Sequence, residues 1–309
     1  MKQTRYKLLI GFLLMAAGLG ISLAQDNSTW VVPKILNTNQ MEWTPVPDLE
    51  EDWLEKVLST DPKTGAVIKI QYIPPGWVDK KGINERHFTD YREWAFTLFG
   101  SLPFCTYNDP ADDTCHLGIS RAGRYLDRPA YNIHGTEGPQ RTAELGLPLS
   151  KTGSAFLIWR EKKGKIFYVR RPTSEEFLKM DKAIFTQPKN IYTDEMDWQP
   201  HPTLKGWLVK PLTDNEVTKV SILYMPAGWI DQPNLGKPIP VKHRKYRYVL
   251  GGEMPFWYYK NSDQREPELA LLQEGYFVDL PPGAVLGAGK RSASRTGCSF
   301  LQIIRYDLK

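Results

Sequence analysis

Apolar and polar residues alternate in short stretches along most of this chain. Val67–Ile73 alternates until Pro74-Pro75-Gly76, and residues 220–225 behave alike before Pro226-Ala227-Gly228. A period of two residues predicts strands with one buried face, and Pro and Gly predict the turns that end them. The pattern therefore favours short strands joined by turns.

Further strands are predicted at residues 94–99 and 246–250, and we expect them to end at Gly100 and at Gly251-Gly252. A helical period is visible only around residues 175–180. The predicted class is therefore all-β. A hydrophobic content of 41% and a charged content of 24% are those of a globular protein, which excludes general disorder.

The chain carries the same pattern twice. Three separate pairs of segments match at one offset of 152 residues: Ile70–Asp79 with Ile222–Asp231, Gly100–Phe104 with Gly252–Phe256, and Gly123 plus Pro129 with Gly275 plus Pro281. We therefore predict two tandem domains, at residues 25–160 and 196–309. Residues 161–195 are predicted to form a linker with a short helix and a crossing strand.

Residues 1–24 have the pattern of a signal peptide. Lys2, Arg5 and Lys7 precede an apolar run that ends at Leu23-Ala24, and polar residues follow directly. An uncleaved membrane anchor is the alternative, because the apolar run is almost long enough to span a bilayer. We expect cleavage, no stable membrane insertion afterwards, and a periplasmic or secreted protein. Cleavage lowers the formal charge from +5 to +2 (37 basic against 35 acidic residues), which gives no support for nucleic-acid binding.

Export changes how the three cysteines are interpreted. Cys105 and Cys115 flank a turn-rich segment, and an oxidising compartment favours a disulfide between them over metal ligation. Cys298 lies in an apolar run and is predicted to be a buried small hydrophobic residue.

The two copies differ where metal-ligating residues stand in the first. At the offset of 152, His87 is matched by Ile239, Glu93 by Lys245 and His134 by Leu286. A lysine would repel a cation, and the two aliphatic residues offer no donor. Any metal site is therefore expected in copy one alone. His116, His201 and His243 have no partner at ligand spacing and are predicted to be structural or exposed.

These residues resemble the cupin signature. Copy one has His87-Phe-Thr89-Asp-Tyr-Arg-Glu93, six residues to Gly100, and then Gly123, five residues, Pro129-Ala-Tyr131, two residues and His134. Copy two has Gly275, five residues, Pro281-Pro-Gly283, two residues and Leu286. The chain looks like a bicupin similar to the ChrR-like and dihydroxyacetophenone dioxygenase branch. The resemblance implies two double-stranded β-helix (jelly-roll) barrels.

The resemblance also implies a metal site in copy one, with two departures. Thr89 stands where a second His is usual, and Tyr131 stands where a Gly is usual. The remaining set, His87, Glu93 and His134, suits one divalent transition metal, with Fe(II) preferred and Mn, Ni or Zn as alternatives. Because a straight strand would place His87 and Glu93 about 20 Å apart, the chain is expected to bend between them.

Two classes of function follow. The first is a metal-dependent dioxygenase acting on a small organic substrate, or an isomerase or lyase in which Glu93 is the catalytic base. The second is a non-catalytic bicupin that binds a small ligand or serves a structural role, with copy two as scaffold. A homodimer formed through exposed strands is a further expectation.

Overall fold

The computed structural model describes residues 30–46, 53–77, 85–135, 150–231, 234–288 and 294–307. The predicted signal peptide lies outside these ranges. No helix within them is long and apolar enough to cross a membrane. Strands dominate throughout, which confirms the all-β class.

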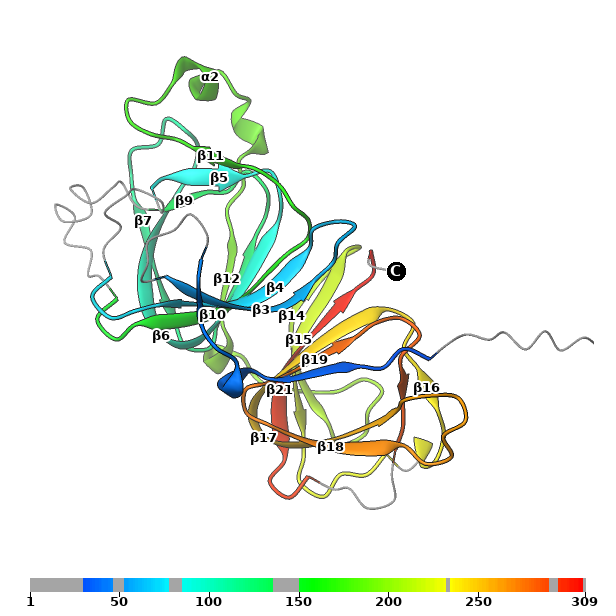
Figure 1. Ribbon diagram of the computed structural model, residues 1–309. Helices are drawn as coiled ribbons and strands as arrows, with labels where there is room; N and C mark the ends of the chain where they lie inside the picture. The colour runs from blue at the N-terminus through cyan, green and yellow to red at the C-terminus, as the bar shows by residue number, and fades with distance from the viewer. Residues whose placement is uncertain are drawn as a thin grey trace, which may run out of the picture.

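The strands form two sheets, each rolled into a barrel (Figure 1). The N-terminal barrel is built from β2 (Thr44–Pro45), β3 (Leu54–Thr60), β4 (Val67–Ile73), β5 (His87–Thr89), β6 (Glu93–Tyr107), β7 (His116–Arg121), β8 (Arg124–Arg128), β9 (Ile133–Gly135), β10 (Ser154–Arg160), β11 (Ile166–Tyr168) and β12 (Lys189–Tyr192).

The C-terminal barrel is built from β1 (Lys34–Asn37), β13 (Gln199–Pro200), β14 (Leu208–Asp214), β15 (Thr218–Met225), β16 (Ile239–Pro240), β17 (Arg244–Tyr259), β18 (Glu268–Gln273), β19 (Tyr276–Leu280), β20 (Val285–Leu286) and β21 (Cys298–Arg305). The helical turns are η1 (Thr38–Gln40), α2 (Glu175–Leu178), η2 (Lys182–Ile184) and η3 (Thr193–Glu195).

The long strands β6 and β17 connect the two layers of each barrel. The prediction that these strands end at Gly100 and Gly251-Gly252 is wrong, because both continue to Tyr107 and Tyr259. Gly100 and Gly252 have φ of 75° and 81°. A Cβ atom there would lie 1.9 Å and 2.1 Å from the carbonyl oxygens of Gly153 and Gly297. Each glycine therefore allows a continuous strand to bend beneath a neighbouring backbone.

The two barrels exchange one strand each. β1 precedes the first barrel in sequence but pairs with β19 of the second, from Lys34 opposite Asp279 to Asn37 opposite Tyr276. β12 precedes the second barrel but pairs with β8 of the first. In Figure 1, β1 accordingly lies along the C-terminal barrel. β1 therefore links the segment before the first barrel to the second barrel, and β12 links the segment before the second barrel to the first.

Matching bonds hold both exchanged segments. Thr38 donates from its amide and its hydroxyl to the Gly275 carbonyl, at 3.0 Å and 2.6 Å. Thr193 donates to the Gly123 carbonyl in the same two ways, at 3.1 Å and 2.7 Å. Lys56 then donates to the Thr38 carbonyl at 2.8 Å. The pattern is that of an approximate two-fold relation between the barrels.

Two buried carboxylates bridge the barrels. Asp127 accepts from Arg92 at 2.7 Å and 2.8 Å, and from the Thr213 hydroxyl of the other barrel at 2.9 Å. In the second copy, Asp279 takes the role of Asp127 and accepts from Arg244 and, at 2.7 Å, from Ser59. Charge-assisted bonds of this kind fix the orientation of neighbouring groups. The barrels consequently meet in one fixed arrangement.

Apolar residues of both barrels pack into a single core between these bridges. It includes Trp94 and Trp159 from the first barrel, and Tyr246, Phe277 and Leu301 from the second. Trp94 and Trp159 are fully buried. Since this core is shared, we expect the barrels to unfold together.

The linker covers the outside of β5 and β9. Phe177 and Phe185 pack edge-on against the buried Phe88, with ring centroids 5.6 Å away in each case. β11 adds to the edge of β5, and α2 lies above it in Figure 1.

Several smaller predictions are confirmed. Cys105 and Cys115 form a disulfide, and Cys298 is 1% exposed. The chain also bends between β5 and β6, so that Glu93 begins a new strand.

The shared core and the carboxylate bridges generate one test. Replacing Asp127 with Asn removes a buried charge that accepts bonds from both barrels, and we expect a loss of about 2 kcal/mol in unfolding free energy. Chemical denaturation followed by tryptophan fluorescence should show one transition at a lower midpoint. Asp214→Asn is the matched control, because its ion pair with Lys219 is exposed, and we expect little change. Two separate transitions in either variant would contradict a shared core.

Candidate functional site

The N-terminal barrel encloses a cavity of about 1090 Å³, including its open mouth. Apolar walls come from Trp53, Leu102, Phe104 and Phe156, among others. The polar and ionisable residues that line the cavity are Gln71, His87, Thr89, Tyr91, Glu93, Ser120, Arg124, Arg128, His134, Arg160 and Tyr168. The structure thus brings the three predicted metal ligands, His87, Glu93 and His134, into one cavity.

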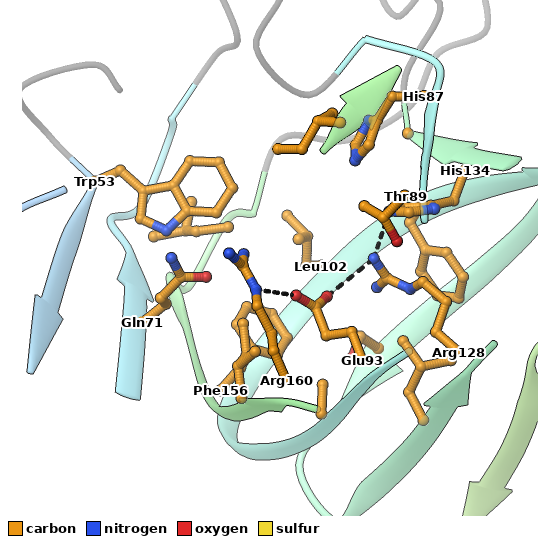
Figure 2. Close-up of a pocket in the computed structure, with 18 of the residues that line it drawn as sticks. Trp53, Gln71, His87, Thr89, Glu93, Leu102, Arg128, His134, Phe156 and Arg160 are labelled. Atoms are coloured by element: carbon orange, nitrogen blue, oxygen red, sulfur yellow. Dashed lines mark hydrogen bonds and ion pairs between the residues drawn. The ribbon is translucent and has the colours of Figure 1, made fainter. Parts of the chain in front are cut away.

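Glu93 lies between two arginines (Figure 2). Arg160 donates from Nε to Oε2 at 2.8 Å, and Arg128 Nη1 lies 3.2 Å from Oε1. The three residues are held in register because β6 pairs with β10 on one side and with β8 on the other, which sets Glu93 opposite both. Each carboxylate oxygen is therefore occupied by a guanidinium group.

This arrangement fixes the charge of Glu93. Burial alone would raise the pKa of the carboxyl, but the charges of Arg160 and Arg128 outweigh it and lower the pKa below its ordinary value. Glu93 is consequently ionised at neutral pH and is a weaker base than an ordinary glutamate. Its surroundings favour an ion-pairing role over the predicted role of general base.

The two histidines lie side by side on β5 and β9, with ring centroids 4.2 Å apart. His87 Nδ1 donates to the Glu85 carbonyl at 2.6 Å, and His134 Nδ1 donates to the Asn132 carbonyl at 3.0 Å. Burial lowers the pKa of His87 to about 4 and that of His134 well below its usual value. Both rings are therefore neutral, and Nε2 of each ring is unprotonated.

The lone pair of His134 is taken by an arginine. Arg128 Nη1, which also pairs with Glu93, donates to His134 Nε2. A guanidinium group therefore stands between two of the three predicted ligands and repels any cation there. Thr89 adds no ligand, because its hydroxyl donates to the Tyr91 carbonyl at 2.8 Å.

The predicted metal set consequently does not fit a metal ion. No group of three or more His, Cys, Asp or Glu side chains in the described part of the chain is arranged to hold one. The histidine tautomers alone would suit metal ligation. Each ring donates through Nδ1 to a backbone carbonyl, as ligating histidines commonly do, which leaves Nε2 as the ligating atom. The fixed charge of Arg128 overrides that preference.

Tyr131 occupies the position that the family pattern gives to glycine. Its φ is 62°, and the matching Gly283 has a φ of 85°. A non-glycine residue in this region costs on the order of 1–2 kcal/mol. Contact with Phe88, at a ring-centroid distance of 5.7 Å, offsets part of that cost. The backbone turn that carries His134 is thus retained despite the substitution.

The metal-ligand pattern of the sequence gives no indication of the three cavity arginines, Arg124, Arg128 and Arg160. Arg128 is matched by Leu280 at the offset of 152, a difference that the same comparison could have shown. Arg124 is 2% exposed, donates to Asn190 of the exchanged strand β12, and lies 4.1 Å from the centre of the Phe104 ring. Its role could not have been found without the strand exchange.

The C-terminal barrel is filled where the first is hollow. Gln71, Ser120 and Arg128 are matched by Leu223, Leu272 and Leu280, all of which are at most 2% exposed and belong to one apolar cluster. Besides Arg244, which pairs with Asp279, β17 carries two further cationic residues. Lys245 replaces Glu93, and Arg247 replaces Ala95 and donates to Gln302 at 3.1 Å. The cavity lining is therefore specific to copy one.

The remaining histidines and the paired tryptophans lie away from this cavity or support its wall. His116 bonds to Asn108 and Asp112 on the surface, and His201 accepts from two backbone amides. His243 contacts Tyr306. Trp77 and Trp229 pack edge-on against Trp53 and Trp207, as expected for structural residues.

Comparison with known proteins identifies the fold. No family model matches the sequence, and no curated protein matches it. Solved structures do match over most of both chains. Protein Ylba from E. coli, described by the family model DUF861, superposes with a TM-score of 0.55 at 10% identity, covering 89% of this chain and 93% of that one.

Two further structures give the same result. The oxalate decarboxylase of Lactobacillus farciminis, in a formate complex, has a TM-score of 0.55 at 13% identity and covers 89% of this chain and 86% of its own. A cupin 2 conserved barrel domain protein from Leptotrichia buccalis has a TM-score of 0.50 at 11% identity, with 88% and 96% covered. Identities this low establish the fold and not the activity. With two jelly-roll barrels in tandem, the chain has the fold of these bicupin structures.

Proposed function

We propose that this protein binds a small organic molecule inside its N-terminal barrel, with the C-terminal barrel as a closed scaffold. The observation that carries the proposal is the contrast between the two interiors. One fold and one register give a polar cavity in copy one and packed leucines in copy two. Concave sites with apolar walls and a few converging polar groups are typical of ligand sites.

The polar groups of the cavity are costly to keep without a function. Arg128, Glu93 and Arg160 are mostly buried, with side chains 18%, 11% and 28% exposed. Buried ion pairs of this kind add little net stability compared with apolar residues of similar size, and copy two shows that this fold accepts such residues. A bound ligand would use these groups, which supports a binding site over a purely structural barrel.

The metal-dependent dioxygenase is the competing function. The paired histidines favour it through their tautomers, whereas Arg128 opposes it by bonding to His134 and Glu93. The ligand set does not fit a metal ion while Arg128 bonds to two of its three members. The geometry supports ligand binding best, and chemistry at Glu93 is disfavoured by its lowered pKa.

Filling the cavity tests the binding proposal. The double variant Gln71→Leu/Ser120→Leu copies Leu223 and Leu272 of the second barrel, so the chain should fold while the cavity closes. A library of small organic molecules is screened by thermal unfolding, in which a ligand that binds the folded protein raises the midpoint, and raises it more the higher its concentration is relative to its Kd. We expect ligands that stabilise the natural protein to lose that effect in the variant.

The control is Gln273→Leu, an equivalent change at an exposed position of β18, which should leave every shift intact. Ligands that stabilise the filled variant as strongly as the natural protein would show that binding lies elsewhere.

Metal content gives a second test. Protein prepared with iron, manganese, nickel and zinc should carry no stoichiometric metal, because Arg128 occupies the space between the predicted ligands. The variant Arg128→Leu/Thr89→His removes that charge and restores the second family histidine, and should gain metal affinity. Elemental analysis after gel filtration measures both. One equivalent of metal in the natural protein, lost in His134→Ala, would contradict the account.

A further inference from the structure

The charges around the cavity do not balance. Arg124, Arg128 and Arg160 face one carboxylate, Glu93, among the lining residues that the structure describes. His87 and His134 donate through Nδ1 to backbone carbonyls, and no second Asp or Glu lines the cavity in the described residues. Three positive charges against one negative charge leave a net charge of +2 on the wall. In a partly enclosed site of lowered dielectric, such a field attracts anions and repels cations.

Arg160 is the arginine best placed to receive an anion. Its Nε is committed to Glu93, and Figure 2 shows its terminal nitrogens turned away from Glu93, toward Gln71 and Trp53. A planar guanidinium edge of this kind matches the two oxygens of a carboxylate. Gln71 adds an amide beside it, and Trp53 adds an apolar wall. The second copy has Ile304 at the position of Arg160 and Leu223 at that of Gln71.

Arg124 contributes a charge that no protein carboxylate neutralises in the described residues. Its bond goes to the neutral amide of Asn190, and its guanidinium lies over Phe104. Burial lowers the pKa of Arg124 to about 10, so that it remains protonated at neutral pH. Burying an uncompensated charge costs several kcal/mol. An anion in the cavity would reduce that cost.

We infer that the ligand of the N-terminal barrel is a small organic acid, whose carboxylate is received by Arg160 and Gln71 under the positive field of Arg124 and Arg128. The inference rests on the proposed binding function and specifies its ligand class. It concerns binding alone and requires no reaction.

Matched acids and amides test it on the full chain. The probes are benzoate with benzamide, and succinate with succinamide, titrated by calorimetry and thermal unfolding. Each acid should bind at least about tenfold more tightly than its amide. Arg160→Met should reduce acid binding to the level of the amide and leave amide binding unchanged. Arg160→Lys keeps the charge and the pairing with Glu93, and should retain part of the acid preference because it lacks the planar edge.

Arg121→Met is the control, since Arg121 is on the surface, where it pairs with Asp194 and Glu195. It should not change either binding constant. Acids that bind no better than amides, or an acid preference that survives Arg160→Met, would overturn the inference. Amides that bind alone would overturn it while leaving the binding function standing. If neither class binds, both the inference and the proposed function fail for ligands of this size.

Discussion

The exchange of strands between the barrels is the constraint on which the rest of this structure depends. β1 completes the sheet of the second barrel and β12 that of the first, so neither barrel is whole without the other half of the chain. Asp127 and Asp279 then accept bonds across the interface, and one apolar core fills the space between the barrels. Many apolar side chains of the N-terminal barrel are consequently buried between the two barrels and not inside the first one.

That division of burial explains how one barrel can be hollow. A barrel stabilised only by its interior would need side chains that fill it, as Leu223, Leu272 and Leu280 fill the second. The first barrel is held by the shared core, the exchanged strand and the linker aromatics around Phe88. Its interior is thereby free to carry Arg128, Glu93 and Arg160, whose buried ion pairs add little net stability.

Within the cavity, the position of Arg128 decides the chemistry. The N-terminal barrel brings His87, Glu93 and His134 into one cavity, and the Arg128 guanidinium group bonds to both His134 and Glu93 there. The same contact turns Glu93 from a candidate base into a counter-ion, because two arginines lower its pKa. A site that would have attracted a cation attracts an anion instead.

The fold was largely predictable from the sequence, and the charged site was not. Alternation and the offset of 152 residues indicated two β barrels, and the spacing from His87 to Glu93 required the bend that the structure shows. The expected strand ends at Gly100 and Gly251-Gly252 were wrong, since glycine here permits a bend and does not stop the strand.

The two exchanged segments are also related by a sequence repeat, but at an offset other than 152 residues. Lys34, Thr38, Met41, Trp43 and Pro45 return 155 residues later as Lys189, Thr193, Met196, Trp198 and Pro200. This repeat would have revealed equivalent segments, although no local pattern tells which barrel each segment joins. The arginines were harder to find, because their meaning depends on strand pairing that sets Glu93 opposite Arg128 and Arg160.

The most direct measurement is a crystal structure of the protein soaked with para-bromobenzoate, with the bromine located by anomalous scattering. The account predicts one bromine site inside the N-terminal barrel, the carboxylate on the terminal nitrogens of Arg160, and none inside the C-terminal barrel. Bromine found only outside the N-terminal barrel, or a metal ion bound by His87 and His134 with Arg128 turned away, would contradict it.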